Sequence, residues 1–88
     1  MSYRLMFSRK AEKQLDALDG YTKKQINAYL RKNVAGSMNP REHGKRLSAN
    51  LAGYWRYRIG DYRVICEIRD DSLTVVALQV GHRSKIYF

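Results

Sequence analysis

Cysteine, histidine and proline are scarce in this chain, and long apolar runs are missing. The 88 residues include a single cysteine, Cys66, which excludes both an internal disulfide framework and a zinc site built from several cysteines. The two histidines, His43 and His82, are too far apart in the sequence to suggest zinc. No segment reaches the roughly 20 apolar residues that cross a bilayer, and the N-terminus has no signal-peptide core. We therefore expect a cytoplasmic protein with no membrane partner.

Acidic residues are also few. Seventeen lysines and arginines stand against eight acids, which gives a formal net charge of +9. The basic residues do not form a tail, and residues 41–63 hold six of them against two acids. Arginine predominates there, and its planar guanidinium suits bidentate contacts with phosphate. The charge predicts a polyanionic partner, although in the N-terminal half a solvated basic face explains it as well.

The first half of the chain predicts one strand and two helices. Residues 3–7 alternate in polarity as a short strand does. Ser8 is a suitable N-cap for a helix that runs to about residue 19, where Gly20 can end it in the left-handed conformation. Thr22 can cap a second helix that ends near Val34. The two helices form a hairpin that can lie across a sheet.

The second half predicts strands over 54–59, 62–68 and 73–80, with residues 41–52 mostly irregular. Gly60-Asp61 is a two-residue hairpin loop, and the third of these strands, apolar on both faces, is expected at the centre of the sheet. The fold class is therefore α+β, a small single domain over residues 1–88. Its order is β-α-α-β-β-β, with antiparallel C-terminal strands in a twisted sheet packed against the N-terminal helical hairpin.

The hairpin gathers basic side chains. Arg56 and Arg58 share a face of one strand, and pairing of Ile59 with Tyr62 places Arg58 opposite Arg63. Like charges opposite one another cost a few tenths to about 1 kcal/mol, so an anion is expected to bind there. The plainer interpretation is a solvated sheet face whose repulsion a nearby acid relieves.

The end of the last strand holds further candidates. Arg83 follows that strand, and its neighbour His82 is a candidate proton carrier. The alternative for His82 is that it only occupies the turn after Gly81 and takes no part in proton transfer. Tyr87 can stack on a nucleic-acid base. The scattered acids form no carboxylate cluster, and no cofactor-binding motif is present, so we expect neither a metal nor a cofactor.

Two segments, Leu51–Ile68 and Val80–Tyr87, strongly resemble RelE-type toxins of the RelE/ParE superfamily of toxin–antitoxin systems. The motifs are Tyr-Arg-Val-x-x-x-Ile beginning at Tyr62 and Val-Gly-His-Arg-x-x-x-Tyr beginning at Val80. The resemblance covers essentially the whole chain and implies the RelE-like fold. It also implies a toxin that enters the ribosomal A site, cuts the mRNA there and is neutralised by a RelB-like antitoxin. Cleavage in such toxins needs no metal: the RNA 2′-OH attacks the adjacent phosphate, leaving a 2′,3′-cyclic phosphate and a 5′-OH.

The resemblance assigns roles to residues of this chain. Arg63 and Arg83 match the arginines that hold the phosphate and the leaving group, and Tyr87 matches the base-stacking tyrosine. Arg56 and Arg58 stand where relatives often carry lysines. A guanidinium stays protonated and can stabilise charge but not act as a base, so the base is open and His82 is the local candidate. Further basic residues are expected to contact RNA phosphates: Lys45, Arg46 and Lys85.

Two other functions fit the same sequence. The ParE branch has the same architecture but inhibits gyrase without cutting RNA, and the arginine set has no evident chemical use there. A non-enzymatic basic domain that binds RNA or the ribosome predicts salt-dependent binding without a cleavage product.

Overall fold

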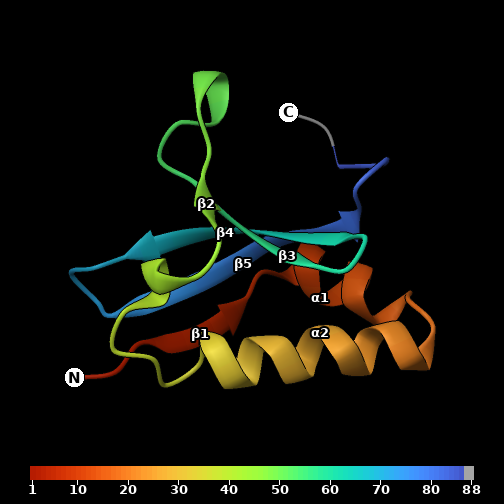
Figure 1. The fold of residues 1–88 in the computed structure, drawn as a ribbon, viewed down its shortest axis with the longest axis horizontal. Coiled ribbons are helices and arrows are strands. Elements are labelled where there is room, and N and C mark those ends of the chain that lie inside the picture. Colours follow the sequence, from red (N-terminus) through yellow and green to blue (C-terminus); the bar gives the residue numbers. More distant parts are fainter. Residues whose placement is uncertain (87–88) are drawn as a thin grey trace.

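The computed structural model describes residues 1–86 as one sheet with two helices packed on one side of it (Figure 1). The elements are β1 (Arg4–Phe7), α1 (Arg9–Asp16), α2 (Gly20–Asn33), β2 (Lys45–Arg46), β3 (Trp55–Ile59), β4 (Tyr62–Arg69) and β5 (Thr74–His82). Short 3-10 turns at Pro40–Glu42 and Ala49–Leu51 flank β2. The predicted α+β class and element order are confirmed, with β2 as an addition that the sequence pattern did not predict.

The sheet has the strand order β1-β5-β4-β3-β2. β1 lies parallel to β5, and all other neighbouring strands are antiparallel. The prediction that the last strand is the central one is wrong by one position: β4 is in the middle, and β5 lies between β4 and β1. β5 is nevertheless paired on both sides, which accounts for its apolar character.

The boundary between the two helices also differs from the prediction. α1 ends at Asp16, and Gly20 is the first residue of α2 instead of a left-handed cap. Asp19 is the N-cap, because its carboxylate accepts hydrogen bonds from the Thr22 N–H and hydroxyl at 3.1 and 2.7 Å. These bonds hold the pKa of Asp19 below its usual value. The predicted N-cap of α1 is confirmed, since Ser8 Oγ accepts from the Ala11 N–H.

The core lies between the helices and the sheet. α1 and α2 contribute apolar residues that share one face of each helix, and the strands contribute alternate residues from their helix-facing side. The fully or nearly fully buried members are Ala11, Leu15, Ile26, Leu30, Val34, Tyr57, Val64, Cys66, Val75, Ala77 and Val80. Burial raises the pKa of the Cys66 thiol to about 12, so the thiol stays protonated at neutral pH.

The opposite face of the sheet is partly covered as well. Ile65 points to that face, yet only 3% of its surface is exposed. The segment after β2 stands above the sheet (Figure 1) and brings Leu51 and Tyr54 to a recess that Ile65 and Leu78 also line. On the face away from the helices, β4 therefore carries an apolar residue, Ile65, next to a basic one, Arg63.

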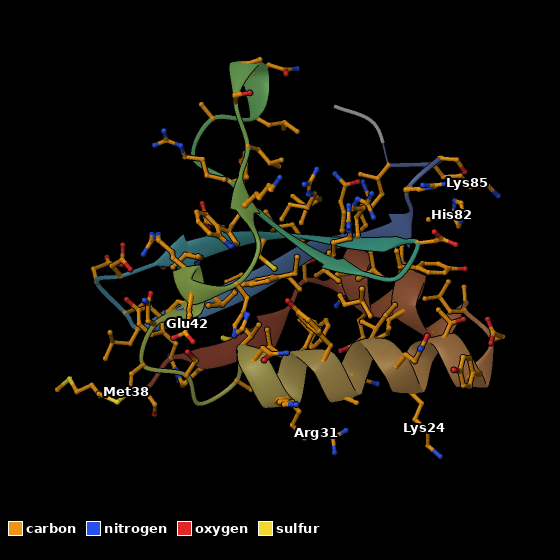
Figure 2. The ribbon with its side chains drawn as sticks, in the orientation of Figure 1. Lys24, Arg31, Met38, Glu42, His82 and Lys85 are labelled. Carbon is orange, nitrogen blue, oxygen red and sulfur yellow. The ribbon has the colours of Figure 1, made fainter. Side chains whose placement is uncertain are left out.

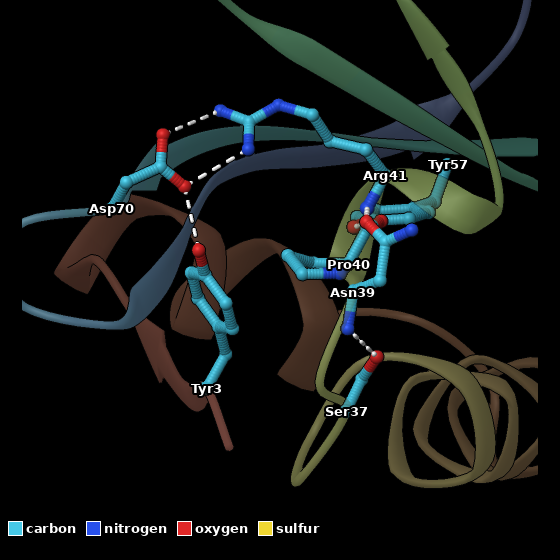
Figure 3. Close-up of polar contacts among 7 residues, drawn as sticks. All are labelled: Tyr3, Ser37, Asn39, Pro40, Arg41, Tyr57 and Asp70. Carbon is cyan, nitrogen blue, oxygen red and sulfur yellow. Dashed lines mark hydrogen bonds and ion pairs between the residues drawn. The ribbon is translucent and has the colours of Figure 1, made fainter. Parts of the chain in front are cut away.

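The loop before β2 is fixed by side chains that reach across the sheet edge. Asp70 accepts two hydrogen bonds from the Arg41 guanidinium, at 2.9 and 3.0 Å, and one from the Tyr3 hydroxyl at 2.6 Å (Figure 3). The Tyr57 hydroxyl donates to the Pro40 carbonyl at 2.6 Å, and Trp55 Nε1 donates to the His43 carbonyl at 2.8 Å. These bonds join the loop to β3 and, through Asp70, to the residue before β1.

No helix of the described residues is long and apolar enough to cross a membrane.

Candidate functional site

The predicted arginine pair forms on the side of the sheet away from the helices. The register pairs Ile59 with Tyr62 and Arg58 with Arg63, as the two-residue loop requires. Arg63 in turn lies opposite Gly81 of β5. Because the neighbours Tyr57, Val64 and Val80 are buried against the helices, alternation puts this row on the opposite face.

Arg56 belongs to the adjoining row, where it lies opposite Ile65 of β4 and opposite Lys45 of β2. No carboxylate of the described residues forms an ion pair with Arg56, Arg58 or Arg63 within 4.0 Å. We call Arg56, Arg58, Arg63 and Arg83 the arginine cluster.

The electrostatics of Arg63 reflect this crowding. Partial burial lowers its pKa, and the nearby charges of Arg56, Arg58 and Arg83 lower it further. The guanidinium stays protonated at physiological pH all the same. The sheet therefore holds several positive charges close together, and among the described acids only Asp61, near Arg63 and Arg83, offsets them.

Arg83 reaches the cluster through the hairpin turn. Its backbone N–H donates to the Asp61 carbonyl at 2.8 Å, and its Nε lies 3.9 Å from Asp61 Oδ1. The side chain remains 64% exposed, so it is free to meet a ligand. Asp61 was read in the sequence only as a turn residue. The structure shows that it also ties the segment after β5 to the arginine hairpin.

Gly81 allows the chain after β5 to fold back over the same face. A Cβ on Gly81 would lie 3.0 Å from Cγ1 of Ile86, so a larger residue there would require the Ile86 side chain to shift. The N–H groups of Lys85 and Ile86 both donate to the His82 carbonyl, which closes the turn. Figure 2 shows Lys85 at this end of β5.

His82 is not brought to the arginine row. It pairs with Tyr62, whose ring meets the imidazole edge to face at 5.5 Å, and both lie one position out of phase with Arg63 and Gly81. Nδ1 of His82 accepts the Ser84 N–H at 3.1 Å, which puts the proton of a neutral ring on Nε2. The role of His82 as a base stays a prediction.

The remaining predicted residues divide between two places. Lys45 lies opposite Arg56 beside the cluster, whereas Arg46 lies opposite Trp55 and lines a separate recess with Arg41 and Tyr54. Tyr87 falls outside the described residues, so its predicted stacking role is untested. Residues 1–86 contain no group of three or more His, Cys, Asp or Glu side chains placed to hold a metal ion.

Comparison with known proteins identifies relatives that share this arrangement of elements. The sequence model of "ParE toxin of type II toxin-antitoxin system, parDE" matches residues 5–87. Toxin RelG of Mycobacterium tuberculosis is 45% identical over 51 residues, which is 58% of this chain and 59% of RelG. The matched part thus spans about three fifths of that curated relative.

Solved structures extend the likeness to the full chain. The toxin–antitoxin complex RelBE2 from Mycobacterium tuberculosis contains a chain 29% identical, with a TM-score of 0.85 over 97% of this chain and 95% of that one. In the RelB–RelE complex from Methanococcus jannaschii the matching chain is 27% identical, with a TM-score of 0.70 over 94% of this chain and 98% of that one. The chain therefore belongs to the RelE/ParE family and is a toxin of a type II toxin–antitoxin system.

Proposed function

We propose that this toxin is a ribosome-dependent mRNA endonuclease that cuts the message in the A site. The single observation that carries the proposal is the arginine cluster, in which no acid of residues 1–86 forms an ion pair with Arg56, Arg58 or Arg63. A phosphate that enters this site meets several guanidinium groups at once. Positive charge placed in this way stabilises negative charge that develops in a transition state.

The proposed reaction needs no metal. The RNA 2′-OH attacks the adjacent phosphate, the bond to the 5′ oxygen of the next nucleotide breaks, and the products carry a 2′,3′-cyclic phosphate and a 5′-OH. Arg63 and Arg83 stabilise the dianionic phosphorane and the departing oxygen, while Arg56 and Arg58 add positive charge beside them. Arginine cannot accept the 2′-OH proton, so His82 remains the proposed base. This role requires that Nδ1 of His82 first release the Ser84 N–H, because that bond occupies the unprotonated nitrogen of the neutral ring. Tyr87 remains the proposed stacking residue.

The proposed partner in the cell is a RelB-like antitoxin. The support is that several related structures are toxin–antitoxin complexes of the RelBE type. With a net charge of +9 on this chain, we expect an acidic antitoxin segment to cover the arginine cluster. A complex in which no acidic side chain contacts these arginines would contradict this part of the proposal.

Primer extension on a translated mRNA tests the function directly. The purified chain is added with and without ribosomes, and cuts are expected only where ribosomes occupy the message. End analysis should find the cyclic phosphate on the upstream fragment. Binding without any cut would instead favour a non-enzymatic ribosome-binding domain.

A second candidate is inhibition of gyrase, which the match to the ParE family description favours. It predicts that the folded, growth-inhibiting protein leaves translated mRNA intact and blocks DNA supercoiling by purified gyrase. A supercoiling assay beside the primer-extension assay separates the two functions.

A further inference from the structure

β5 does not alternate evenly along its whole length. The register between β4 and β5 shifts by one residue at Leu78, which has no partner on β4 and forms a β-bulge. Ala77 and Val80 are both buried against the helices, although an even alternation puts residues 77 and 80 on opposite faces. The bulge therefore changes which side chains in the second half of β5 face the helices.

The bulge also decides on which face Arg83 lies. Gly81, the residue after the buried Val80, lies opposite Arg63. The Arg83 N–H continues this pairing, since it donates to the Asp61 carbonyl at 2.8 Å. Residues 81 and 83 share a face, so Arg83 lies on the face of the arginine cluster. An even alternation along β5 would instead turn Arg83 towards the helices.

The bulge lies where β5 loses a neighbouring strand. β1 ends opposite Ala77, so the outer edge of β5 beyond Ala77 has no strand beside it among residues 1–86. Side chains of α1 and of its N-cap bond to that edge instead. Ser8 Oγ donates to the Leu78 carbonyl at 3.2 Å. Gln14 Oε1 accepts the Val80 N–H at 2.8 Å, so the bulge is held from both of its ends.

Gln14 is a polar residue at a position where packing favours an apolar one. It lies in the second half of α1, away from the cap, and shares a helix face with Ala11 and Leu18. The side chain is half-buried beside β5 and lines a recess with Leu18 and Val80. Its amide oxygen satisfies a backbone N–H that would otherwise have no acceptor at this edge.

We propose that Gln14 is a positioning residue for Arg83: its amide holds the bulge of β5 and so keeps the Arg83 guanidinium on the face of the arginine cluster. The inference rests on the proposed function, in which Arg83 acts on the phosphorane and the departing oxygen. Gln14 itself lies on the helix side of the sheet and acts only through β5. A displacement of about 1 Å in a positioned group can cost about 100-fold in rate.

Gln14→Met tests the hold on the bulge, because it removes the acceptor and keeps the length of the side chain. β5 beyond the bulge would then be held by β4 alone, so the Val80 and Arg83 amide hydrogens should exchange with solvent about tenfold faster. Gln14→Glu keeps an oxygen acceptor and should restore slow exchange. Hydrogen-exchange NMR of the free protein measures this step without RNA. Gln25→Met, the same substitution at an exposed position of α2, is the matched control.

Cleavage of translated mRNA tests the consequence for Arg83. At saturating ribosomes, Gln14→Met is expected to lower the cleavage rate about 10- to 100-fold, with little change in the ribosome concentration that gives half the maximal rate. A purely structural role would lower the urea midpoint and leave the rate of the folded protein unchanged. In an Arg83→Ala chain, Gln14→Met should cost less than about twofold more, because both changes remove the same contribution.

The proposal is overturned if Gln14→Met behaves like Gln25→Met in exchange or in cleavage, or if Gln14→Glu is as impaired as Gln14→Met. It is also overturned if the losses from Gln14→Met and Arg83→Ala multiply in the double variant. The proposed function fails separately. A wild-type chain that leaves translated mRNA intact, while its amide exchange responds as described, supports the hold of Gln14 on Arg83 and overturns only the endonuclease.

Discussion

At the scale of single residues, the basic cluster on the sheet is made of arginines, whose guanidinium groups keep their positive charge. Arg58 and Arg63 face each other across two strands with no described acid paired to either, an arrangement that costs stability in the free protein. Lysines at these positions would keep the charge but lose the planar fork that binds two phosphate oxygens at once. The cost is consistent with a ligand-binding role rather than a structural one.

Arg83→Ala tests that role. Under the proposed chemistry we expect cleavage of translated mRNA to fall about 10²–10³-fold, as when one charge-stabilising donor is removed from an active site. Since the side chain is 64% exposed, the free energy of unfolding should change by no more than about 0.5 kcal/mol. Primer extension and urea unfolding measure the two effects. Arg31→Ala on the outer side of α2 is the control (Figure 2), and equal activity of the two variants would refute the assignment.

Gly44 gives a second prediction at this scale. Gly44→Ala should lower the free energy of unfolding, because the new Cβ would collide with the Arg56 carbonyl and overpacking costs about 1–3 kcal/mol. Gly36→Ala is the matched control: Gly36 also has a positive φ, +78°, but nothing lies within 4 Å of its Cβ position. Urea unfolding should show the larger loss for Gly44. Equal losses would mean that backbone strain alone matters at both sites.

At the scale of elements, Asp70 joins three distant parts of the chain. Its carboxylate binds Tyr3, just before β1, and Arg41, in the turn before β2, from its own place after β4 (Figure 3). The hydrogen bonds from Arg41 and Tyr3 lower the pKa of Asp70 from 3.8 to about 2. Exposed ion pairs are usually weak, but here one carboxylate accepts from two side chains.

The pKa of Asp70 fixes the sign of a pH effect. Because the folded state binds this proton less readily than the unfolded chain, the contribution to stability is complete above about pH 4. It is lost as the pH falls through about 2. We expect Asp70→Asn to destabilise the protein at pH 7 and to flatten the pH dependence of the urea midpoint between pH 4 and 2. Asp71→Asn is the control, because it removes the adjacent carboxylate and leaves the hydrogen bonds of Asp70 in place. The same flattening in that variant would contradict the assignment.

The hairpin of β3 and β4 could be predicted from the sequence, because a two-residue loop fixes which residues face each other. The Arg58–Arg63 pair followed from that register alone. The helix boundary could not be settled in the same way, because Gly20 fits either the end of one helix or the start of the next. The Asp19 carboxylate decides between them by capping α2.

The second half of the site depends on contacts between residues far apart in the sequence. β2 has only two residues, too few to show the alternation of polar and apolar residues that marks a strand. It forms because Trp55 and Tyr57 donate hydrogen bonds to carbonyls of the preceding loop. A recess lined by Tyr29, Gly44, Lys45, Arg56 and Arg58 forms where α2 meets β3, which no local sequence pattern specifies. The sequence signal for this recess is Gly44, beside Lys45. A glycine indicates close backbone packing here only once the position of the β3 backbone is known.

At the scale of the whole molecule, β4 and β5 are the two longest strands and form the longest pairing in the sheet. Each of these strands is paired on both sides and buries residues against the helices. We expect their amide hydrogens to exchange most slowly with solvent, and those of β2 to exchange fastest among the strands. Hydrogen-exchange NMR at neutral pH measures the order. Rapid exchange across β4 would show that the sheet opens without global unfolding.

The parallel pairing of β1 with β5 has a consequence for synthesis. Residues 4–7 pair with residues 74–77, so β1 has no partner strand until β5 has been synthesised. While β5 is still inside the ribosomal exit tunnel, the emerging chain holds the arginine hairpin but not the strand that backs it. A chain broken off before residue 74 would therefore lack both pairings of β5, with β1 and with β4, and its first strand would have no partner in the sheet.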